Sequence, residues 1–273
     1  MIQAKVLKDS VNQWGNRLTT LEVEFPRIIL SEFNTHRVFS RNSASSRAIP
    51  TAKLLERVEN DPFMPEKFPV NQPGMSATEY IGPGDEMYSW CKTQWLIAKD
   101  NAINSAKALL ALGVHKQIAN RLLEPFMYHT VIVSSTEWQN FWDLRISEFA
   151  QPEIRATAEA MKAAINASEP EIRLNDEWHL PLTGFEGDDK LTEEQLIKVS
   201  VARCARVSYL THDGIRDTDK DIAMFDSLAA NWHLSPFEHV AQPTKGKYSE
   251  ANFKGWTQAR WFVEHNLELT GNK

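Results

Sequence analysis

The sequence predicts a fold of the α+β class, because strand and helix patterns follow one another without a repeating order. Near the N-terminus, Leu21, Val23 and Phe25 alternate with polar residues, and residues 128–133 form a second, β-branched strand pattern. Helical spacing of apolar residues covers residues 85–112 and again residues 154–165. Neither an all-helical nor an all-strand fold accommodates both kinds of pattern.

The size and composition are those of a globular protein, and we predict one domain over residues 1–273. A chain of this length buries about 75% of the surface that its unfolded form exposes. Two cysteines, Cys91 and Cys204, exclude a disulfide framework and a cysteine-rich zinc module. Its net charge of −6 argues against a surface that coats nucleic acid. With no long apolar run and no signal-peptide pattern, we expect a cytoplasmic protein without membrane contact.

The elements are expected in the following order. Strand patterns fill most of residues 1–30, a polar stretch follows, and residues 53–58 form a short helix. Residues 59–84 contain five prolines and three glycines, which predicts a long loop of the kind that often forms a lid. The helix at 85–112 ends before Gly113, and its apolar face contains Met87, Cys91, Trp95, Ala98, Ala102, Ala106 and Leu109.

The second half is predicted to be mainly helical. A helix over residues 116–123 ends at Pro125, and a strand follows it. Capping boxes predict two further helix starts, one from Ser134 with Glu137 and one from Thr192 with Gln195. Pro152 in a first turn opens a helix between them, and one more helix is expected over residues 220–231.

Residues 35–47 are the first candidate for chemistry. This stretch holds three arginines, one histidine and four serines, the side chains that a phosphate group needs. On composition alone, a solvated polar loop explains it equally well. Residues 233–239 contain two histidines and one glutamate, but their spacing fits no zinc pattern, and we expect no metal.

Two further candidates also have simple structural explanations. Arg145 shares a predicted helix with apolar residues and needs a partner, which a salt bridge with Asp143 or Glu148 would supply. Arg203 and Arg206 near the end of another helix suit the negative end of its dipole. Cys204 between them has no acid or histidine beside it in sequence, so a small buried residue is the preferred interpretation.

Taken together, these stretches resemble the flavin-dependent thymidylate synthases. The family hallmark is Arg-His-Arg, seven residues and then Ser, and here Thr35-His36-Arg37 precedes Ser45 at that spacing. The chain also contains the similar motifs Asn140-Phe141-x-x-Leu144-Arg145, Ala150-Gln151-x-Glu153-Ile154, Ala205-Arg206-Val207-Ser208 and Ser235-Pro236-Phe237-Glu238-His239. The last two come first in the usual family order, so the chain looks like a circular permutant, which is possible when the termini lie close together.

The resemblance implies a family fold with a mixed or antiparallel sheet flanked by long helices, and it implies site residues. FAD would contact His36, Arg37, Asn42, Asn140, Ser208, His233, Ser235 and Glu238. The nucleotide would contact Glu32, Ser45, Ser46, Arg47, Arg121 and Arg145, and Asn120 competes with Arg121 for its position because that match needs an insertion. Arg145 and Ser45 are the implied catalytic residues.

The implied reaction is thymidylate synthesis from dUMP, with methylenetetrahydrofolate as one-carbon donor, FAD as cofactor and NADPH as reductant. It needs no protein nucleophile, since the flavin carries the difficult chemistry. The resemblance also implies a homotetramer with shared active sites. Rearranged members of this kind are expected in phage nucleotide metabolism, which would place the protein in the host cytoplasm.

Four departures from the family pattern leave other functions open. Thr35 replaces the first arginine, Ser43 a glutamate, Glu32 a phosphate-binding glutamine and Phe149 a histidine beside the flavin. An unneutralised carboxylate at position 32 would repel a phosphate. The alternatives are a hydroxymethylase acting on dUMP or dCMP, a homologue that binds nucleotide or flavin without catalysis, and a nucleic-acid-binding protein, which the acidic balance disfavours.

Overall fold

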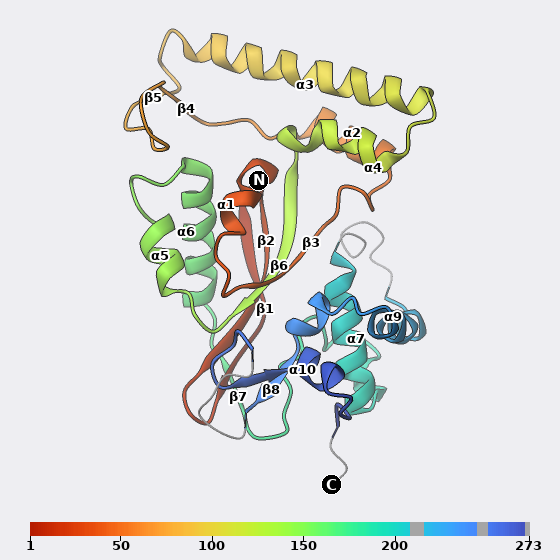
Figure 1. Cartoon of the computed structure of the whole chain (residues 1–273). Coiled ribbons are helices and arrows are strands. Elements are labelled where there is room, and N and C mark those ends of the chain that lie inside the picture. The colour runs from red at the N-terminus through yellow and green to blue at the C-terminus, as the bar shows by residue number, and fades with distance from the viewer. Residues whose placement is uncertain (208–215, 245–250, 271–273) are drawn as a thin grey trace.

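The computed structural model describes residues 1–207, 216–244 and 251–270, and its centre is a five-stranded sheet (Figure 1). Its order is β3-β6-β2-β1-β7, and every pairing is antiparallel except β1 with β7. The strands are β1 (Gln3–Asn12), β2 (Arg17–Pro26), β3 (Ser40–Ser43), β6 (Tyr128–Ser135) and β7 (Glu171–Arg173). The α+β class with a mixed sheet is therefore confirmed.

A tight hairpin joins the first two strands. Gly15 has φ +83°, a conformation that glycine adopts without strain, and the Asn12 side chain accepts hydrogen bonds from the backbone N–H groups of Trp14 and Asn16. The predicted alternation in β2 is confirmed, since Leu21, Val23 and Phe25 are fully buried.

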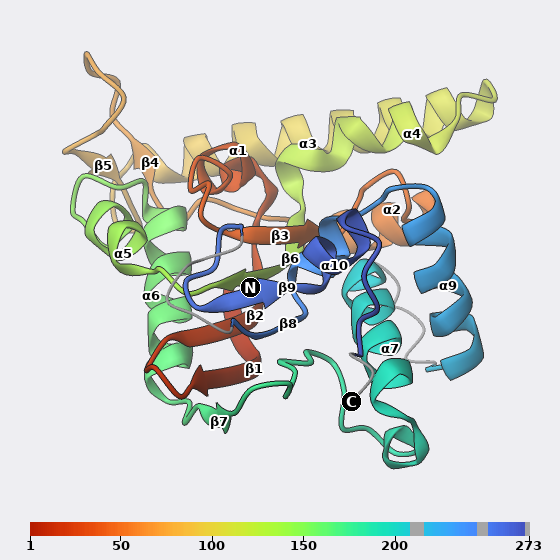
Figure 2. The same ribbon diagram turned by 60° about the horizontal axis from the view of Figure 1, so that its bottom comes forward.

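One face of the sheet is covered by three helices: α1 (Leu30–Phe33), α5 (Gln139–Arg145) and α6 (Pro152–Asn166). The buried residues of α6 are spaced at helical intervals from Ile154 to Ile165, and Pro152 stands in its first turn, as predicted. Figure 2 shows α5 and α6 on one side of the strands and α7 and α9 on the opposite side. This layer positions the end of α5, where Arg145 lies.

A second layer holds α2 (Thr51–Asn60), α3 (Tyr88–Ala111), α4 (Lys116–Ala119) and the 3-10 helix η2 (Asn120–Phe126). The long helix is confirmed, but its predicted apolar face is wrong in part. Ala106 is buried and Trp95 and Ala102 pack partly buried against this layer, whereas Met87 and Ala98 are exposed. Helical spacing therefore identified the buried face in the middle of α3 but not at Met87, and it omitted the buried Ile103.

The C-terminal part packs against the sheet beside β3 and β6. It contains α7 (Glu193–Ala205), α9 (Thr218–Ala230), η4 (Ser235–Glu238), β8 (Ala241–Pro243), β9 (Trp256–Gln258) and α10 (Ala259–Glu264). The capping box of Thr192 with Gln195 at the start of α7 is confirmed. Cys204 is buried among apolar residues, as predicted, and burial raises the pKa of its thiol.

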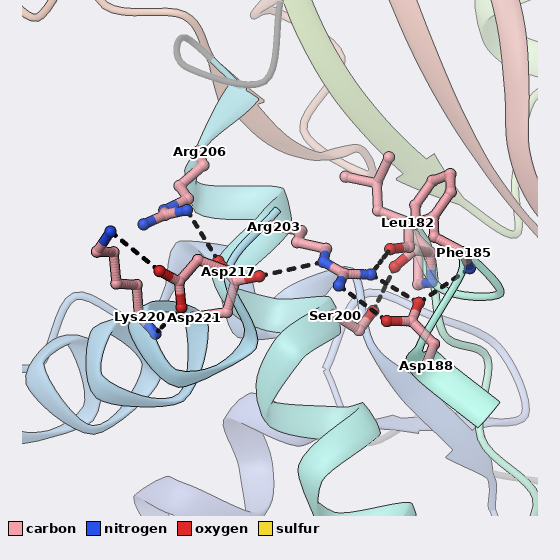
Figure 3. A network of polar contacts seen from close by, with 10 residues as sticks. Leu182, Phe185, Asp188, Ser200, Arg203, Arg206, Asp217, Lys220 and Asp221 are labelled. Atoms are coloured by element: carbon pink, nitrogen blue, oxygen red, sulfur yellow. Dashed lines mark hydrogen bonds and ion pairs between the residues drawn. The ribbon is translucent and has the colours of Figure 1, made fainter. Parts of the chain in front are cut away.

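A buried ionic network joins α7 to α9 and to η3 (Asp188–Lys190), and Figure 3 shows its contacts. Arg203 donates to both oxygens of Asp188 at 2.7 and 2.9 Å, to Asp221 Oδ2 at 3.1 Å and to the Leu182 carbonyl at 2.9 Å. Its side chain is 2% exposed. The expected helix-dipole role of Arg203 is thus replaced by direct ion pairing.

Four local expectations are corrected. The predicted helix start at Ser134 is wrong because β6 continues through Ser135, and Ser134 Oγ instead lies 2.6 Å from Thr20 Oγ1. The polar stretch before residue 47 contains β3, and the loop at 59–84 contains two short strands, β4 (Phe68–Pro69) and β5 (Tyr80–Ile81). The helix expected over 116–123 changes to 3-10 geometry at Asn120.

Assignment of the whole chain to one domain stays a prediction. In the part of the chain that the structure describes, no helix has the length and apolar character needed to cross a bilayer.

Candidate active site

Arg145, the last residue of α5, is the centre of a polar cluster formed with α1 and the turn after it. Its Nε donates to His36 Nε2 at 2.9 Å, its Nη1 pairs with Glu32, and its Nη2 donates to Thr35 Oγ1 at 3.3 Å. We call Arg145, Glu32, Thr35 and His36 the Arg145 cluster. Asp143, one of the two expected partners, instead accepts from Gln139. More than a hundred residues separate Arg145 from the other members, so packing of α5 beside α1 creates the cluster.

His36 is a neutral member of this cluster. Burial, followed by the charges of Arg145 and Arg41, lowers the pKa of His36 to about 4. A neutral ring that accepts at Nε2 carries its proton on Nδ1. Phe141 meets the ring edge to face at 4.7 Å, and Phe39 stacks on it at 5.7 Å. The ring therefore has a fixed position from which it orients Arg145.

The Arg145 side chain is not sealed, because 17% of it is exposed, as is 31% of the Glu32 side chain. Arg145 neutralises the carboxylate that was expected to repel a phosphate. Solvent access also means that both groups can exchange their partners for a ligand, which a fully enclosed ion pair cannot do.

Residues 45–47, which we call the serine-arginine loop, belong to a second polar group around Glu124. Ser46 Oγ and Arg121 Nη1 donate to the same oxygen of Glu124, at 2.6 and 2.7 Å, and Arg27 Nη2 is 3.5 Å from it. Asn120 is fully buried and donates to the backbone carbonyl of Ser46 at 2.7 Å. Asn120 therefore anchors the loop, while Arg121 is exposed and has the accessible donors. Arg47 is exposed, and Ser45 is partly buried.

The predicted FAD residues are distributed unevenly. Arg37 and Glu238 line one cavity of about 530 Å³ together with Phe39 and Arg41. Asn42 is buried and donates to the Cys204 carbonyl at 3.5 Å. Asn140, His233 and Ser235 are exposed, and Ser208 lies outside the described residues.

The cavity has residues that suit an anionic dinucleotide. Three guanidinium groups, those of Arg37, Arg41 and Arg260, line it, and guanidinium is the side chain best matched to phosphate oxygens. Burial lowers the pKa of Arg41, although the Glu238 carboxylate acts in the opposite direction. A bound anion would therefore relieve the cost of burying this cation.

Several lining residues were missed by the sequence analysis. Arg41 lies within residues 35–47, but the sequence analysis assigned it no role. Asn252, Gln258, Arg260 and Trp261 belong to a tail that no motif covers. No local signal marks this tail, because the pairing of β9 with β8 and contacts with distant residues such as Ser40 bring it to the cavity. Among the described residues, no group of three or more His, Cys, Asp or Glu is placed to hold a metal ion.

Comparison with known proteins identifies the family. The model of the thymidylate synthase complementing proteins matches residues 18–171, which is more than half of the chain. The chain belongs to this family. The match contains the whole Arg145 cluster and the serine-arginine loop, whereas the segments around Cys204 and Glu238 follow it in sequence.

Solved structures similar to this chain include two of the UMP/dUMP methylase PolB from Streptomyces cacaoi. The structure with 5-Br UMP is 17% identical, covers 60% of this chain and 88% of that one, and has a TM-score of 0.47. The structure with 5-Br dUMP is 17% identical, covers 60% of this chain and 90% of that one, and has a TM-score of 0.49. Among curated proteins, no sequence gives a significant match.

Proposed function

We propose that this protein transfers a one-carbon unit from methylenetetrahydrofolate to C5 of a deoxypyrimidine monophosphate, with dUMP as the preferred substrate. FAD is the proposed cofactor and NADPH the proposed reductant. The observation that carries the proposal is the Arg145 cluster, which lies inside the family match and keeps a partly exposed guanidinium in a fixed position. Family membership supports the reaction class.

Arg145 is the proposed catalytic residue that holds the pyrimidine. The ring attacks an electrophile through C5 in its electron-rich, enolate-like form, which carries negative charge on a ring carbonyl oxygen. A pre-positioned guanidinium would stabilise that charge and so favour this form. His36 fixes the Nε side of Arg145, so rotation of the guanidinium is restricted. FAD, when bound, supplies the one-carbon relay and the hydride. The protein contributes orientation and electrostatic stabilisation.

The nucleotide phosphate is proposed to bind at Ser45, Ser46, Arg47 and Arg121, with Ser45 also in the catalytic set. Ser46 and Arg121 already donate to one carboxylate oxygen of Glu124. Their donors therefore converge on a point where an anion is accepted, and a phosphate oxygen has the same acceptor chemistry. Glu32 is proposed to contact the nucleotide through its pairing with Arg145 rather than as a free carboxylate.

FAD is proposed to bind at the cavity beside β3 through Arg37 and Glu238, with His36, Asn42, Asn140, Ser208, His233 and Ser235 around it. A circular permutation, which is part of this proposal, would account for the late position of these motifs in the chain. Ser134 Oγ lies 2.8 Å from His239 Nδ1, so η4 packs on β6 although more than a hundred residues separate them. The motifs after the family match thus complete the site formed by residues within it.

A homotetramer with shared active sites is part of the proposal. Large apolar residues of α3 lie exposed along the helix, including Met87, Trp90 and Ile97. Exposed apolar patches of this kind mark protein interaction sites. Copies of this chain are the proposed occupants of the α3 surface.

A hydroxymethylase is the second candidate, in which water rather than hydride completes the one-carbon transfer. One observation favours it: Glu32 and Thr35, two of the four departures from the family pattern, both contact Arg145. The changes therefore meet at the residue proposed to bind the base.

The test begins with the visible absorption spectrum of the protein after FAD is added and the mixture desalted. We expect retained flavin absorbance. The protein is then given methylenetetrahydrofolate, NADPH and either dUMP or dCMP, and the product mass is measured. A gain of CH₂ supports methylation, and a gain of CH₂O supports the hydroxymethylase. A colourless protein would contradict the proposal, and flavin binding without product from either nucleotide would favour the non-catalytic homologue.

A further inference from the structure

The tail at residues 251–264 is firmly attached to the cavity proposed for FAD. Gln258 is buried, and its Nε2 donates to Ser40 Oγ at 3.1 Å and to the Glu238 carbonyl at 2.9 Å. Asn252 Nδ2 donates to the Val38 carbonyl at 3.1 Å. The tail is therefore held both to the β3 segment and to η4, the two sides that supply the predicted FAD residues.

Arg260 extends from this tail into the same cavity. Its Nη1 donates to Glu238 Oε1 at 2.6 Å, and its Nε donates to Glu264 Oε1 at 2.8 Å. Nη2 makes no hydrogen bond to any residue that the structure describes, and 40% of the side chain is exposed. Two carboxylates thus orient Arg260 while one amino group stays available to a ligand.

The charges around the cavity favour an anion. Arg37, Arg41 and Arg260 contribute three positive charges, and Glu238 and Glu264 contribute two negative ones. One positive charge is left over even with Arg260 ion-paired. Trp261 adds an aromatic surface to the same wall, and aromatic surfaces suit the flat rings of a dinucleotide.

We propose that residues 251–264 form one wall of the FAD site and that Arg260 binds the pyrophosphate of FAD. This inference rests on the proposed function, which supplies FAD as the ligand of the cavity. Arg260 lies outside the family match and outside every motif quoted above. It supplies a guanidinium to the cavity that Arg37, the second arginine position of the hallmark motif, also lines.

The experiment compares FAD affinity of the wild type and Arg260→Gln by flavin fluorescence anisotropy. Arg155→Gln is the matched control, because Arg155 forms the same i,i+4 pair with Glu159, at 2.9 Å, away from the cavity. We expect Arg260→Gln to weaken FAD binding about tenfold or more, the usual effect of one hydrogen bond to a charged group. Arg155→Gln should bind as the wild type does.

Riboflavin, which lacks the pyrophosphate, is the second probe. We expect Arg260→Gln to leave riboflavin affinity unchanged, and Arg260→Lys to recover part of the FAD affinity. An equal loss of FAD and riboflavin would overturn the assignment, since a general disturbance of the site would then explain it. A loss of NADP⁺ affinity with unchanged FAD affinity would also overturn the assignment, because Arg260 would then bind the pyrophosphate of the reductant.

The proposal and the proposed function fail in different ways. Unchanged FAD affinity in both Arg260→Gln and Arg260→Lys, with a wild type that binds FAD, would overturn the role of Arg260 alone. A wild type that binds no FAD would overturn the proposed function and this inference together.

Discussion

Two arginine clusters in this protein look alike in their contacts and differ in their access to solvent. Arg203 pairs with Asp188 and Asp221 inside the C-terminal part, and 2% of its side chain is exposed (Figure 3). Arg145 pairs with Glu32 and His36 beside the sheet, and 17% of its side chain is exposed. Each guanidinium is held by three or more side-chain or backbone acceptors.

The difference in access separates a structural role from a candidate functional one. Arg203 outweighs the effect of burial on Asp188 and holds the pKa of that carboxyl below its usual range, so both groups stay charged inside the protein. Removal of either partner would leave a charge without water or a counterion. At the Arg145 cluster, solvent or a ligand can take the place of a lost partner.

The largest effect on stability is expected from Arg203→Ala. The variant leaves Asp188 buried without a counterion, while Asp221 keeps its ion pair with Arg206 at 3.1 Å. It should lower the free energy of unfolding by about 3–5 kcal/mol. Urea denaturation measures this, with Arg155→Ala as the exposed control, which should change stability by less than about 0.5 kcal/mol. A loss below about 1 kcal/mol for Arg203→Ala would contradict the structural role.

If Arg203→Ala gives no folded protein, Asp188→Asn tests the same network. It keeps the shape of the side chain and should cost about 1–3 kcal/mol, the usual penalty for an impaired buried hydrogen bond. A variant as stable as the wild type would show that the network contributes little.

Arg145→Ala should separate activity from stability. Turnover should fall about 10²–10³-fold, the usual effect of losing one donor to a developing negative charge. The free energy of unfolding should change by less than about 1 kcal/mol, because solvent reaches the carboxylate of Glu32, the charged partner of Arg145. FAD absorbance should be retained after desalting. Full activity, or a stability loss as large as that of Arg203→Ala, would remove the distinction between the clusters.

The smallest effect is expected from acidification, which acts on the Arg145 cluster through His36. Because the folded protein holds the pKa of His36 at about 4 and the ordinary value is 6.5, the unfolded chain binds a proton that the folded chain does not. Stability should therefore be full above about pH 6.5 and fall as the pH drops towards 4.

A pH of about 5.5 is one unit below the ordinary pKa of histidine. At that pH, His36 should contribute about 1.4 kcal/mol to the loss of stability. His36→Gln is the control, since His129 and His239 are also buried, have pKa values lowered to about 3 and titrate in both proteins. The wild type should lose more stability than His36→Gln between about pH 7.5 and 5.5. Equal losses would show that His36 is not neutral in the folded protein.

Local patterns in the sequence predicted the elements that depend on neighbouring residues. The alternation in β2, the apolar face of α6 and the capping box of α7 are all as expected. The helix expected to start at Ser134 starts instead at Gln139, because β6 has partners on both sides. Pairing with β2 and β3 extends the strand through a serine that also fits a capping box. Tertiary hydrogen bonds here outweigh a local signal.

The candidate site was predictable only in part, and only through its motifs. Glu32, His36 and Arg145 were each singled out, but no property of the sequence places Arg145 on Glu32. The choice of Arg121 over Asn120 stays a prediction; burial favours it, since Asn120 donates to a backbone carbonyl inside the protein. Residues 251–264 carry no recognisable motif, and their place at the cavity depends on the β8–β9 pairing.

By itself, the sequence determined the α+β class, most element positions, the family and the arginine-serine chemistry, because periodicity, capping and motif spacing act over a few residues. Only the tertiary structure decided which charges meet. Arg203 is enclosed by Asp188 and Asp221, Arg145 stays open beside Glu32, and Arg260 reaches the cavity from the tail. The physical reason is that burial and pairing of charges depend on how elements far apart in the sequence pack together. Patterns among neighbouring residues do not specify that packing.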